Sequence, residues 1–493
     1  MPPLVITAYT LRHLLMCERR VWLDQHGDKT TRTDRAQVGS ERGKLHEQLV
    51  SAAMFGPANP VPAVSWDAML QATRDLMTHG AAGIQGAAFE RSLDLSPAQT
   101  VIVRGRVDWL RRVAQPSAFG KWAYEPVEIK LRGEPTEADT LQLDLYLWLL
   151  QGLQAVEPSG WLWLGRDEYN QPSQIIEHSY NEDRLFTALE RACATLAATS
   201  ALPIFLASHC DTCHWQTSCK QIASAGRSLA ALPGLPRQTW EHMQREGIMT
   251  LDHILVLSPQ DLQRFKGLGK SKAHDIYTAA QAIGTGQPVQ RNRLPDAAWQ
   301  PGMMLDLETC IEGVVGVPWC FGWQGWEGQF QVAIVDAFYD DARLILPDGL
   351  LVTIVPDSDA GWRLFAAEAE ANPGPIYHWG SFEKGVLRAT APDEVIDALD
   401  DRLHDLNRTF KRTFVFPVRG TSIKTVAPYL GFRWPEGTNA FSAWDDYRAW
   451  LLDSDKQALA RACAYNRADV EAMALIWRWM IDNHADLSSN VVE

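Results

Sequence analysis

The order of apolar and polar residues divides the chain into stretches of different character. Residues 1–225 open with the spacing of amphipathic helices and continue with short runs that alternate in the manner of strands. Residues 226–290 carry short helical patterns broken by proline and glycine. The polar, proline-bearing segment 285–302 is typical of a linker, and strand patterns begin again at 302, before long helices. We therefore expect domains at 1–225, 226–290 and 300–493.

Within these stretches, alternation and β-branched or aromatic content mark individual strands. A long apolar run at 140–153 (TLQLDLYLWLLQGL) predicts a helix between two groups of them. The mixture predicts an α/β protein of several domains. The expected strands cover residues 87–95, 101–110, 122–131, 161–165, 174–180, 303–308, 319–325 and 329–336.

Length and composition fit this picture. A chain of 493 residues exceeds one core at roughly 100–200 residues per domain, and 46% hydrophobic with 22% charged residues is ordinary globular composition. No apolar run approaches the roughly 18 residues of a membrane span, and the N-terminus lacks the pattern of a signal peptide. We expect a cytoplasmic protein with no membrane partner. The net charge of −14 excludes a basic coat for passive nucleic-acid binding, but not a metal-dependent enzyme that concentrates carboxylates.

The segment VEIK places Glu128 and Lys130 two residues apart on an expected strand, so both side chains leave the same face. The preceding expected strand carries Asp108 in GRVDWL. If the two strands are antiparallel neighbours, two carboxylates and a lysine meet. Two carboxylates can bind a cation such as Mg²⁺, and the lysine can orient or help to deprotonate a bound water and stabilise negative charge. A solvated ion pair on a strand is the alternative.

The longer ordered pattern is more specific. GxxHE, GxxD, ExK and QxxxY follow one another, and together they resemble the RecB-type branch of the PD-(D/E)xK nucleases. The resemblance implies a restriction-endonuclease-like α/β fold. Valine rather than proline precedes the aspartate, a common departure in this branch. The resemblance also implies that His46, Asp108 and Glu128 are metal ligands and that Lys130 is the catalytic lysine. It implies that Gln142 and Tyr146, which share one helix face, support the site and contact DNA.

Three of the eight cysteines crowd into HCDTCHWQTSCK as Cys210, Cys213 and Cys219. In a reducing compartment such a cluster indicates metal rather than disulfides, and Cys17 is the best candidate for a fourth thiolate. A zinc knuckle that uses His209 or His214 is the alternative. The set resembles the AddB-like and CRISPR-associated RecB-type nucleases, which implies a structural [4Fe-4S] cluster held by one early and three late cysteines.

The middle region contains a Gly-Leu-Gly turn in GLGKSKA, between two helical stretches. It resembles a helix-hairpin-helix element, in which glycines let the backbone approach a phosphate that helix N-terminal amides then bind. Gly267, Gly269, Lys270 and Lys272 are the expected nucleic-acid contacts, made to the backbone without base specificity. A small helical spacer is the alternative.

The strand MMLDLET puts Asp306 and Glu308 on one face of an otherwise apolar strand, a costly place for two acids unless they bind metal. Glu383 follows a strand-to-helix turn in HWGSFEKGVL, and Tyr465 and Asp469 lie four apart on one helix face in AYNRADVEAM. Two metal ions need about four carboxylates and can activate water and stabilise the leaving oxygen. The tyrosine can orient that water.

This order resembles the DEDD exonucleases of the RNase H-like superfamily, in the form found after RecB-type domains. The resemblance implies metal ligands at Asp306, Glu308, Glu383 and Asp469, with Tyr465 in a catalytic role and Glu383 standing where most members have aspartate. The basic stretch 408–424 is either a track for a nucleic-acid backbone or a charged surface hairpin.

Taken together, the regions predict a metal-dependent nuclease that uses Mg²⁺ or Mn²⁺ at two sites. We expect an exonuclease acting on DNA single strands or ends, with RNA open as a substrate, in repair, recombination or defence. One alternative has one or both sites retired, so that the chain is a DNA-binding subunit of a helicase or defence complex. Another is a zinc-stabilised scaffold unrelated to nucleic acid.

Overall fold

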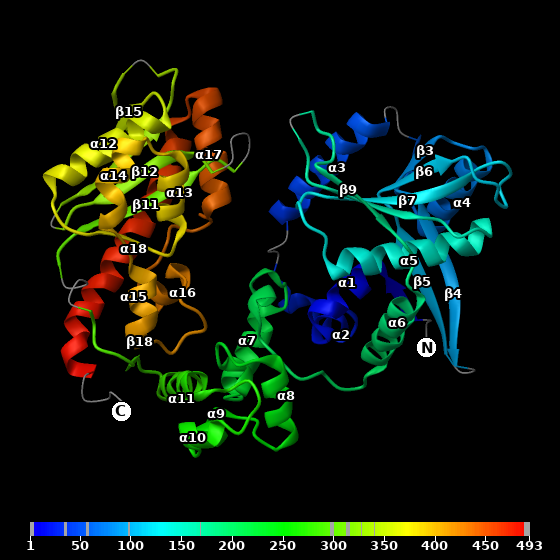
Figure 1. Cartoon of the computed structure of the whole chain (residues 1–493), viewed down its shortest axis with the longest axis horizontal. Helices are drawn as coiled ribbons and strands as arrows, with labels where there is room; N and C mark the ends of the chain where they lie inside the picture. The colour runs from blue at the N-terminus through cyan, green and yellow to red at the C-terminus, as the bar shows by residue number, and fades with distance from the viewer. Residues whose placement is uncertain are drawn as a thin grey trace. The chain divides into compact units, whose positions relative to one another are not determined.

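The computed structural model describes residues 4–33, 37–55, 59–96, 99–167, 169–295, 300–311, 316–326, 328–339 and 341–487. The chain divides into two compact units, Met1–Ala225 and Gly226–Glu493 (Figure 1). Each unit has its own hydrophobic core. None of the helices in the described ranges combines the length and the apolar character needed to cross a bilayer.

The first unit is built on two sheets. One has the order β1 (Leu4–Thr7), β5 (Gln99–Arg106), β4 (Ala88–Ser96). The other has the order β2 (Asn59–Pro60), β3 (Gly83–Gln85), β6 (Trp109–Val113), β7 (Ala123–Lys130), β8 (Gly160–Leu164), β9 (Gln174–His178). In the second sheet β7 pairs antiparallel with β6 and parallel with β8. β7 therefore has a hydrogen-bonded neighbour on each edge, and six of its eight residues are buried.

Helices surround these sheets. The apolar run of the sequence forms α5 (Glu137–Gln154), which begins where the Thr136 N–H and the Asp139 carboxylate close a capping box and packs against β7. Its Leu141, Leu145 and Leu149 lie in the core of the unit. The other helices are α1 (Ala8–Met16), α2 (Glu18–His26), α3 (Gln37–Phe55), α4 (Trp66–Thr78), α6 (Glu182–Ala197) and α7 (Gln216–Ala225), with short 3-10 turns η1 (Lys29–Thr31) and η2 (Ser208–Thr212).

The expected strand 101–110 is interrupted in the structure. β5 ends at Arg106 and β6 begins at Trp109, and the two strands belong to different sheets. Asp108 therefore lies in the bend between two sheets rather than within a strand, and its main-chain carbonyl accepts a hydrogen bond from Gly86 N–H at 3.0 Å. The continuous alternation of VIVRGRVDWL could not reveal the bend, because both halves are apolar on the buried face.

The second unit begins with helices α8 (Arg237–Arg245), α9 (Leu251–Leu255), α10 (Pro259–Leu262) and α11 (Lys270–Thr285), after the 3-10 turn η3 (Leu229–Ala231). α11 packs on a two-stranded ribbon formed by β10 (Val289–Gln290) and β18 (Phe414–Val415). The expected linker thus contains a strand that pairs with the C-terminal region. Arg419 strengthens this junction, since its guanidinium donates to the carbonyls of Ala230 and Leu232 at 3.1 and 2.9 Å.

The rest of the second unit surrounds one mixed sheet. Its order is β14 (Arg343–Ile345), β15 (Leu351–Val355), β13 (Phe330–Val335), β12 (Pro318–Gln324), β11 (Met303–Thr309), β16 (Ile376–His378), β17 (Leu403–Asp405). β11 pairs antiparallel with β12 and parallel with β16. The helices are α12 (Ser358–Ala371), α13 (Phe382–Thr390), α14 (Asp393–Leu399), α15 (Leu406–Thr413), α16 (Ile423–Tyr429), α17 (Ala440–Asp453) and α18 (Lys456–Leu487).

Alternation along β11 sends successive side chains to opposite faces of the sheet, and therefore toward different helices. Met303, Leu305 and Leu307 enter a core with residues of α12, α13 and α14. The intervening side chains leave the other face, toward α18, which packs on β11 and β12. This face carries Asp306 and Glu308, so the fold presents the two acids to the long C-terminal helix.

Candidate active sites

The structure brings three acids of the second unit together. Asp306 and Glu308 from β11 and Asp469 from α18 each offer a carboxylate oxygen, and these oxygens lie within 4.8 Å of one another. Among the described residues, this is the only set of three histidine, cysteine or acidic side chains that meets that distance. Carboxylate oxygens so placed are the ligands that Mg²⁺ and Mn²⁺ prefer.

Burial makes this cluster unfavourable for free carboxylates. Desolvation, followed by the charge of Asp469, raises the pKa of Glu308 to about 8. The same two causes, together with Glu308 itself, raise the pKa of Asp306 well above its usual range. Acids that cannot all ionise together are typical of metal and catalytic sites, where a cation supplies the missing charge.

Lys424, the last residue of the basic stretch 408–424, reaches this cluster, although the sequence did not assign it to the site. Lys424 of α16 forms an ion pair with Asp469 through its ammonium group. Its Nζ lies 4.2 and 4.3 Å from the ring centres of Trp434 and Tyr465. Trp434 also donates from Nε1 to the Asp469 carboxylate at 2.8 Å. Lys424 thus provides a positive charge beside the acids.

Asn466 fixes the position of Asp306. Its side-chain amide donates to the Asp306 carboxylate at 2.8 Å and to the Asp306 carbonyl at 3.2 Å. Asn466 is completely buried. It lies three residues before Asp469 on α18, and this spacing on one helix face is the signal that sequence reasoning missed.

Glu383 and Tyr465 border the three acids. Glu383 of α13 is buried and its carboxylate contacts His378 Nδ1 at 3.2 Å, so it turns toward the histidine and lies outside the set of three. Its charge nevertheless contributes to the raised pKa values of Asp306 and Glu308, after desolvation and Asp469. Burial and Asp469 raise the pKa of Tyr465, which keeps the phenol protonated.

In the first unit, β7 and α5 form a hydrogen-bonded chain. Glu128 accepts from the Lys130 ammonium and, at 2.8 Å, from the Gln142 amide. The Gln142 amide also donates to the Tyr146 hydroxyl at 2.7 Å, and that hydroxyl donates to the Arg106 carbonyl at 2.7 Å. Four of the residues expected in this site are therefore in direct contact.

Asp108 and His46 complete the surroundings. The Asp108 carboxylate accepts from the Ile129 N–H at 2.9 Å, which holds it beside β7. His46 of α3 is buried, and desolvation lowers the pKa of its imidazole, while the nearby Lys130 main chain acts in the opposite direction. Within the described residues neither ring nitrogen makes a hydrogen bond of normal distance and angle, and a buried neutral imidazole suits a metal ligand. The three expected ligands do not approach one another as closely as the acids of the second unit.

The charges in this pocket interact strongly. Desolvation and Asp108 raise the pKa of Glu128 to about 8 and that of the neighbouring Glu47 to about 7. Burial by itself would lower the pKa of Lys130, but Glu128 and Asp108 outweigh it and the pKa is raised. Glu47 was not expected in this site, although it directly follows His46 in the GxxHE pattern.

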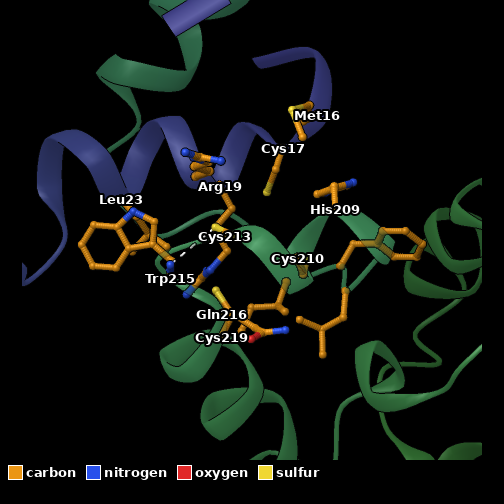
Figure 2. Close-up of a pocket in the computed structure, with 14 residues that line it drawn as sticks. Met16, Cys17, Arg19, Leu23, His209, Cys210, Cys213, Trp215, Gln216 and Cys219 are labelled. Atoms are coloured by element: carbon orange, nitrogen blue, oxygen red, sulfur yellow. Dashed lines mark hydrogen bonds between the residues drawn. The ribbon is translucent and has the colours of Figure 1, made fainter. Parts of the chain in front are cut away.

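The four clustered cysteines line one pocket of the first unit, as Figure 2 shows. Cys17 comes from the break between α1 and α2, Cys210 and Cys213 from η2 and its end, and Cys219 from α7. Burial raises the pKa of Cys17 to about 11 and also raises the pKa values of Cys213 and Cys219. Thiols in such surroundings ionise only when a metal or a strong positive charge binds them.

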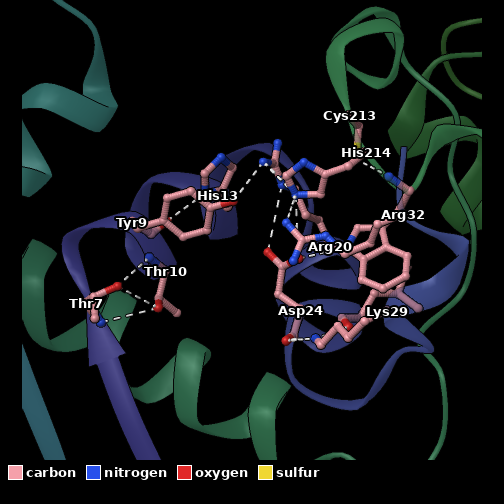
Figure 3. Close-up of polar contacts among 12 residues, drawn as sticks. Thr7, Tyr9, Thr10, His13, Arg20, Asp24, Lys29, Arg32, Cys213 and His214 are labelled. Atoms are coloured by element: carbon pink, nitrogen blue, oxygen red, sulfur yellow. Dashed lines mark hydrogen bonds and ion pairs between the residues drawn. The ribbon is translucent and has the colours of Figure 1, made fainter. Parts of the chain in front are cut away.

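A polar network borders the cysteine pocket (Figure 3). The Arg20 guanidinium contacts His214 Nε2 at 3.3 Å and donates to the Tyr9 hydroxyl at 3.0 Å. Trp215 donates from Nε1 to Asp24 at 2.8 Å. These contacts join α2 to the segment that carries the late cysteines. The Nε2 atom of His214 lies 3.3 and 3.4 Å from the guanidinium groups of Arg20 and Arg32.

The glycine turn lies between α10 and α11. Gly267 has a φ of +94°, and a Cβ there would lie 2.9 Å from Thr239 Oγ1, so glycine is required for conformation and space. Gly269 is the N-cap of α11, and the exposed Lys270 and Lys272 follow in its first turn. The Thr239 hydroxyl donates to the Lys266 carbonyl at 2.7 Å and holds the turn against α8.

Comparison with models of protein families gives a match in the C-terminal part of the chain. Residues 357–481 match the family model of the RNase_H superfamily. The match includes Glu383, Tyr465 and Asp469, and it begins after the strand that carries Asp306 and Glu308. The C-terminal part is therefore RNase H-like, and this similarity favours a nuclease-type phosphodiester hydrolase.

Comparisons with solved structures and with curated proteins support no further assignment. A solved structure described as "Crystal structure of SSO0001" aligns with 44% of this chain and 86% of its own length, at 18% identity and a TM-score of 0.24. A similarity of this size supports no conclusion about fold or function. No curated protein is significantly similar to the chain.

Proposed function

We propose that the protein is a metal-dependent exonuclease that acts on single strands or ends of DNA. The observation that carries the proposal is the convergence of Asp306, Glu308 and Asp469 in an RNase H-like domain. A divalent cation bound there would lower the pKa of a coordinated water and offset the charge of a phosphodiester. Asp306, Glu308 and Asp469 are its proposed ligands, with Glu383 as an outer acid that a small rotation away from His378 would add.

The side chains around the acids have roles that follow from their protonation. Tyr465 keeps its proton, so it acts as a hydrogen-bond donor that orients the attacking water or a phosphate oxygen. Asn466 holds the Asp306 carboxylate in one orientation. Lys424 lies beside Asp469, where its ammonium can contact a phosphate once a metal ion neutralises the acid.

For the first unit we propose a second nuclease site of the RecB type. His46, Asp108 and Glu128 are its proposed metal ligands. Lys130 remains an ammonium at neutral pH because Glu128 and Asp108 raise its pKa, so its role is to stabilise negative charge rather than to accept a proton. Gln142 and Tyr146 hold Glu128 and the bend that carries Asp108.

We further propose that Cys17, Cys210, Cys213 and Cys219 hold a structural [4Fe-4S] cluster. Four thiols that line one pocket are the usual ligand set of such a cluster, and burial raises the pKa values of three of them, so that a bound cation would stabilise their thiolate forms. A single zinc ion is the alternative, and metal analysis of the purified protein distinguishes the two.

Cleavage of end-labelled DNA and RNA in Mg²⁺ or Mn²⁺ tests both sites on protein purified without oxygen. Asp306→Asn should abolish the activity of the second unit, and Lys130→Ala that of the first. The matched controls Asp397→Asn and Lys121→Ala change exposed residues and should leave cleavage unchanged. If Asp306→Asn or Lys130→Ala leaves cleavage unchanged, the corresponding site is not catalytic. A wild-type protein that binds DNA but cleaves nothing would instead favour a binding subunit of a helicase or defence complex.

A further inference from the structure

A groove in the second unit lies between the glycine-turn helices and the RNase H-like domain. One side is formed by α11 and the segment before α8, and the other by β18 and the chain that follows it. Its volume is about 330 Å³, at the small end of ligand-binding sites and close to that of one nucleotide unit. Residues of both the glycine-turn helices and the RNase H-like part line this groove, so it belongs to neither part alone.

The side chains of the groove suit a phosphate and a base. Three cations, Lys272, Arg291 and Lys411, line it against the single acid Asp275. Arg291 pairs with Asp275 at 3.1 Å, while neither lysine has an acidic partner among the described residues and both are exposed. In a chain with a net charge of −14, this local positive excess is unusual.

Apolar side chains form the other part of the lining. Val415 and Val418 are half-buried along the groove, and Phe414 and Phe416 lie behind them in the core. A positive groove with apolar walls is the arrangement that binds single-stranded nucleic acid, since charges follow the backbone and apolar surface accepts bases of any sequence. A duplex is too wide to enter a space of this size.

The groove ends close to the three acids. Thr421 lies at its margin, and its carbonyl accepts a hydrogen bond from Trp379 Nε1 at 3.1 Å, directly after the strand that leads to Glu383. Lys424 follows Thr421 by three residues, a span of at most about 11 Å, and pairs with Asp469. A strand that lies in the groove is therefore directed toward the candidate active site.

We propose that this groove binds the backbone of a single nucleic-acid strand and guides it from α11 to the RNase H-like site. The proposal rests on the proposed function for its direction, but binding in the groove does not depend on cleavage. Lys272 and Lys411 contact successive phosphates, and Val415 and Val418 contact a base. The recognised chemistry is common to DNA and RNA strands.

Binding of fluorescein-labelled (dT)20 and (rU)20 to the full chain in EDTA tests the proposal without cleavage. Each phosphate contact contributes about 0.7 to the slope of log affinity against log salt for a single strand. Lys272→Gln with Lys411→Gln should weaken binding at low salt and reduce the slope by about 1.4. Lys456→Gln, at an exposed lysine of α18 outside the groove, should change neither.

A second measurement locates the strand directly. An oligonucleotide containing 5-iodouracil should crosslink to the peptide around residues 411–421 on irradiation, and the double variant should lose this product. The proposal that the groove binds a strand would be wrong if the double variant kept the affinity and salt slope of the wild type. It would also be wrong if crosslinks formed only with other peptides. If the wild type binds a strand in the groove but cleaves nothing, the groove proposal is supported and the proposed nuclease function is wrong.

Discussion

Gly322 faces Asp306 across the pair of strands β11 and β12, and its lack of a side chain gives Asn466 room to reach that aspartate. A Cβ at Gly322 would lie 1.6 Å from Asn466 Oδ1. Gly322 of β12 therefore leaves the space that Asn466 of α18 needs to reach Asp306 of β11. The position of Asp306, a proposed metal ligand, thus depends on a glycine that is not itself a proposed ligand.

Replacing this glycine should displace Asn466 and, through it, Asp306. We expect Gly322→Ala to lower the free energy of unfolding by about 1–3 kcal/mol, as overpacking does, and to reduce cleavage by the second unit. Thermal melts and single-turnover cleavage measure the two effects. Gly385→Ala in α13 is the matched control, since no atom lies within 4 Å of an added Cβ, and it should be neutral or stabilising.

The buried acids make stability depend on pH. Because the pKa of Glu308 is raised to about 8 in the folded protein, the folded chain binds more protons than the unfolded chain between about pH 5 and 8. The free energy of unfolding should then fall as pH rises through this window, by at most about 1.4 kcal/mol per pH unit for each such proton. Melting in EDTA from pH 5 to 9 measures this slope.

Metal and mutation should both flatten that slope. Mn²⁺ replaces the protons as the partner of the acids, and Glu308→Gln removes one of the titrating groups. Glu128 and Glu47 of the first unit contribute with the same sign, so Glu308→Gln should reduce the slope rather than abolish it. A slope of unchanged size in Glu308→Gln would contradict the assignment.

Lys424 and a metal ion compete for Asp469. Lys424→Ala removes a positive charge beside the acids, so we expect Mn²⁺ to bind more tightly while cleavage becomes slower at saturating metal. Mn²⁺ titration followed by electron paramagnetic resonance measures the first effect. Lys384→Ala removes an ion pair with Asp400 and serves as the control. Weaker Mn²⁺ binding in Lys424→Ala would mean that the lysine supports the metal site instead.

In the proposed cluster, Cys17 would tie the start of the first unit to its end. Cys17→Ser should remove the visible absorption and the iron of a [4Fe-4S] cluster, and it should lower the melting temperature, because the crosslink closes a long loop. By analogy with a disulfide the stabilisation is on the order of 5 kcal/mol. Cys193→Ala, at a buried cysteine outside the pocket, should retain iron. Zinc in place of iron in the wild type would support a zinc site.

Local patterns predicted the elements of the site well. The period of two put Asp306 and Glu308 on one face of a strand, and the structure has β11 at Met303–Thr309. The helical period put Tyr465 and Asp469 on one face, and α18 contains both. These predictions succeeded because backbone geometry alone fixes which neighbours along the chain share a face. The roles of these residues remain predictions that the experiments above address.

The sequence by itself determined the mixed α/β character, the pairs of acids on their strand and helix, and the grouping of the cysteines. Only the tertiary structure decided that β11 faces α18, that Asn466 and Lys424 reach the acids, and that Asp108 lies in a bend between two sheets. Sheet order and helix packing follow from burying apolar surface far apart in the chain, and no local period carries that information.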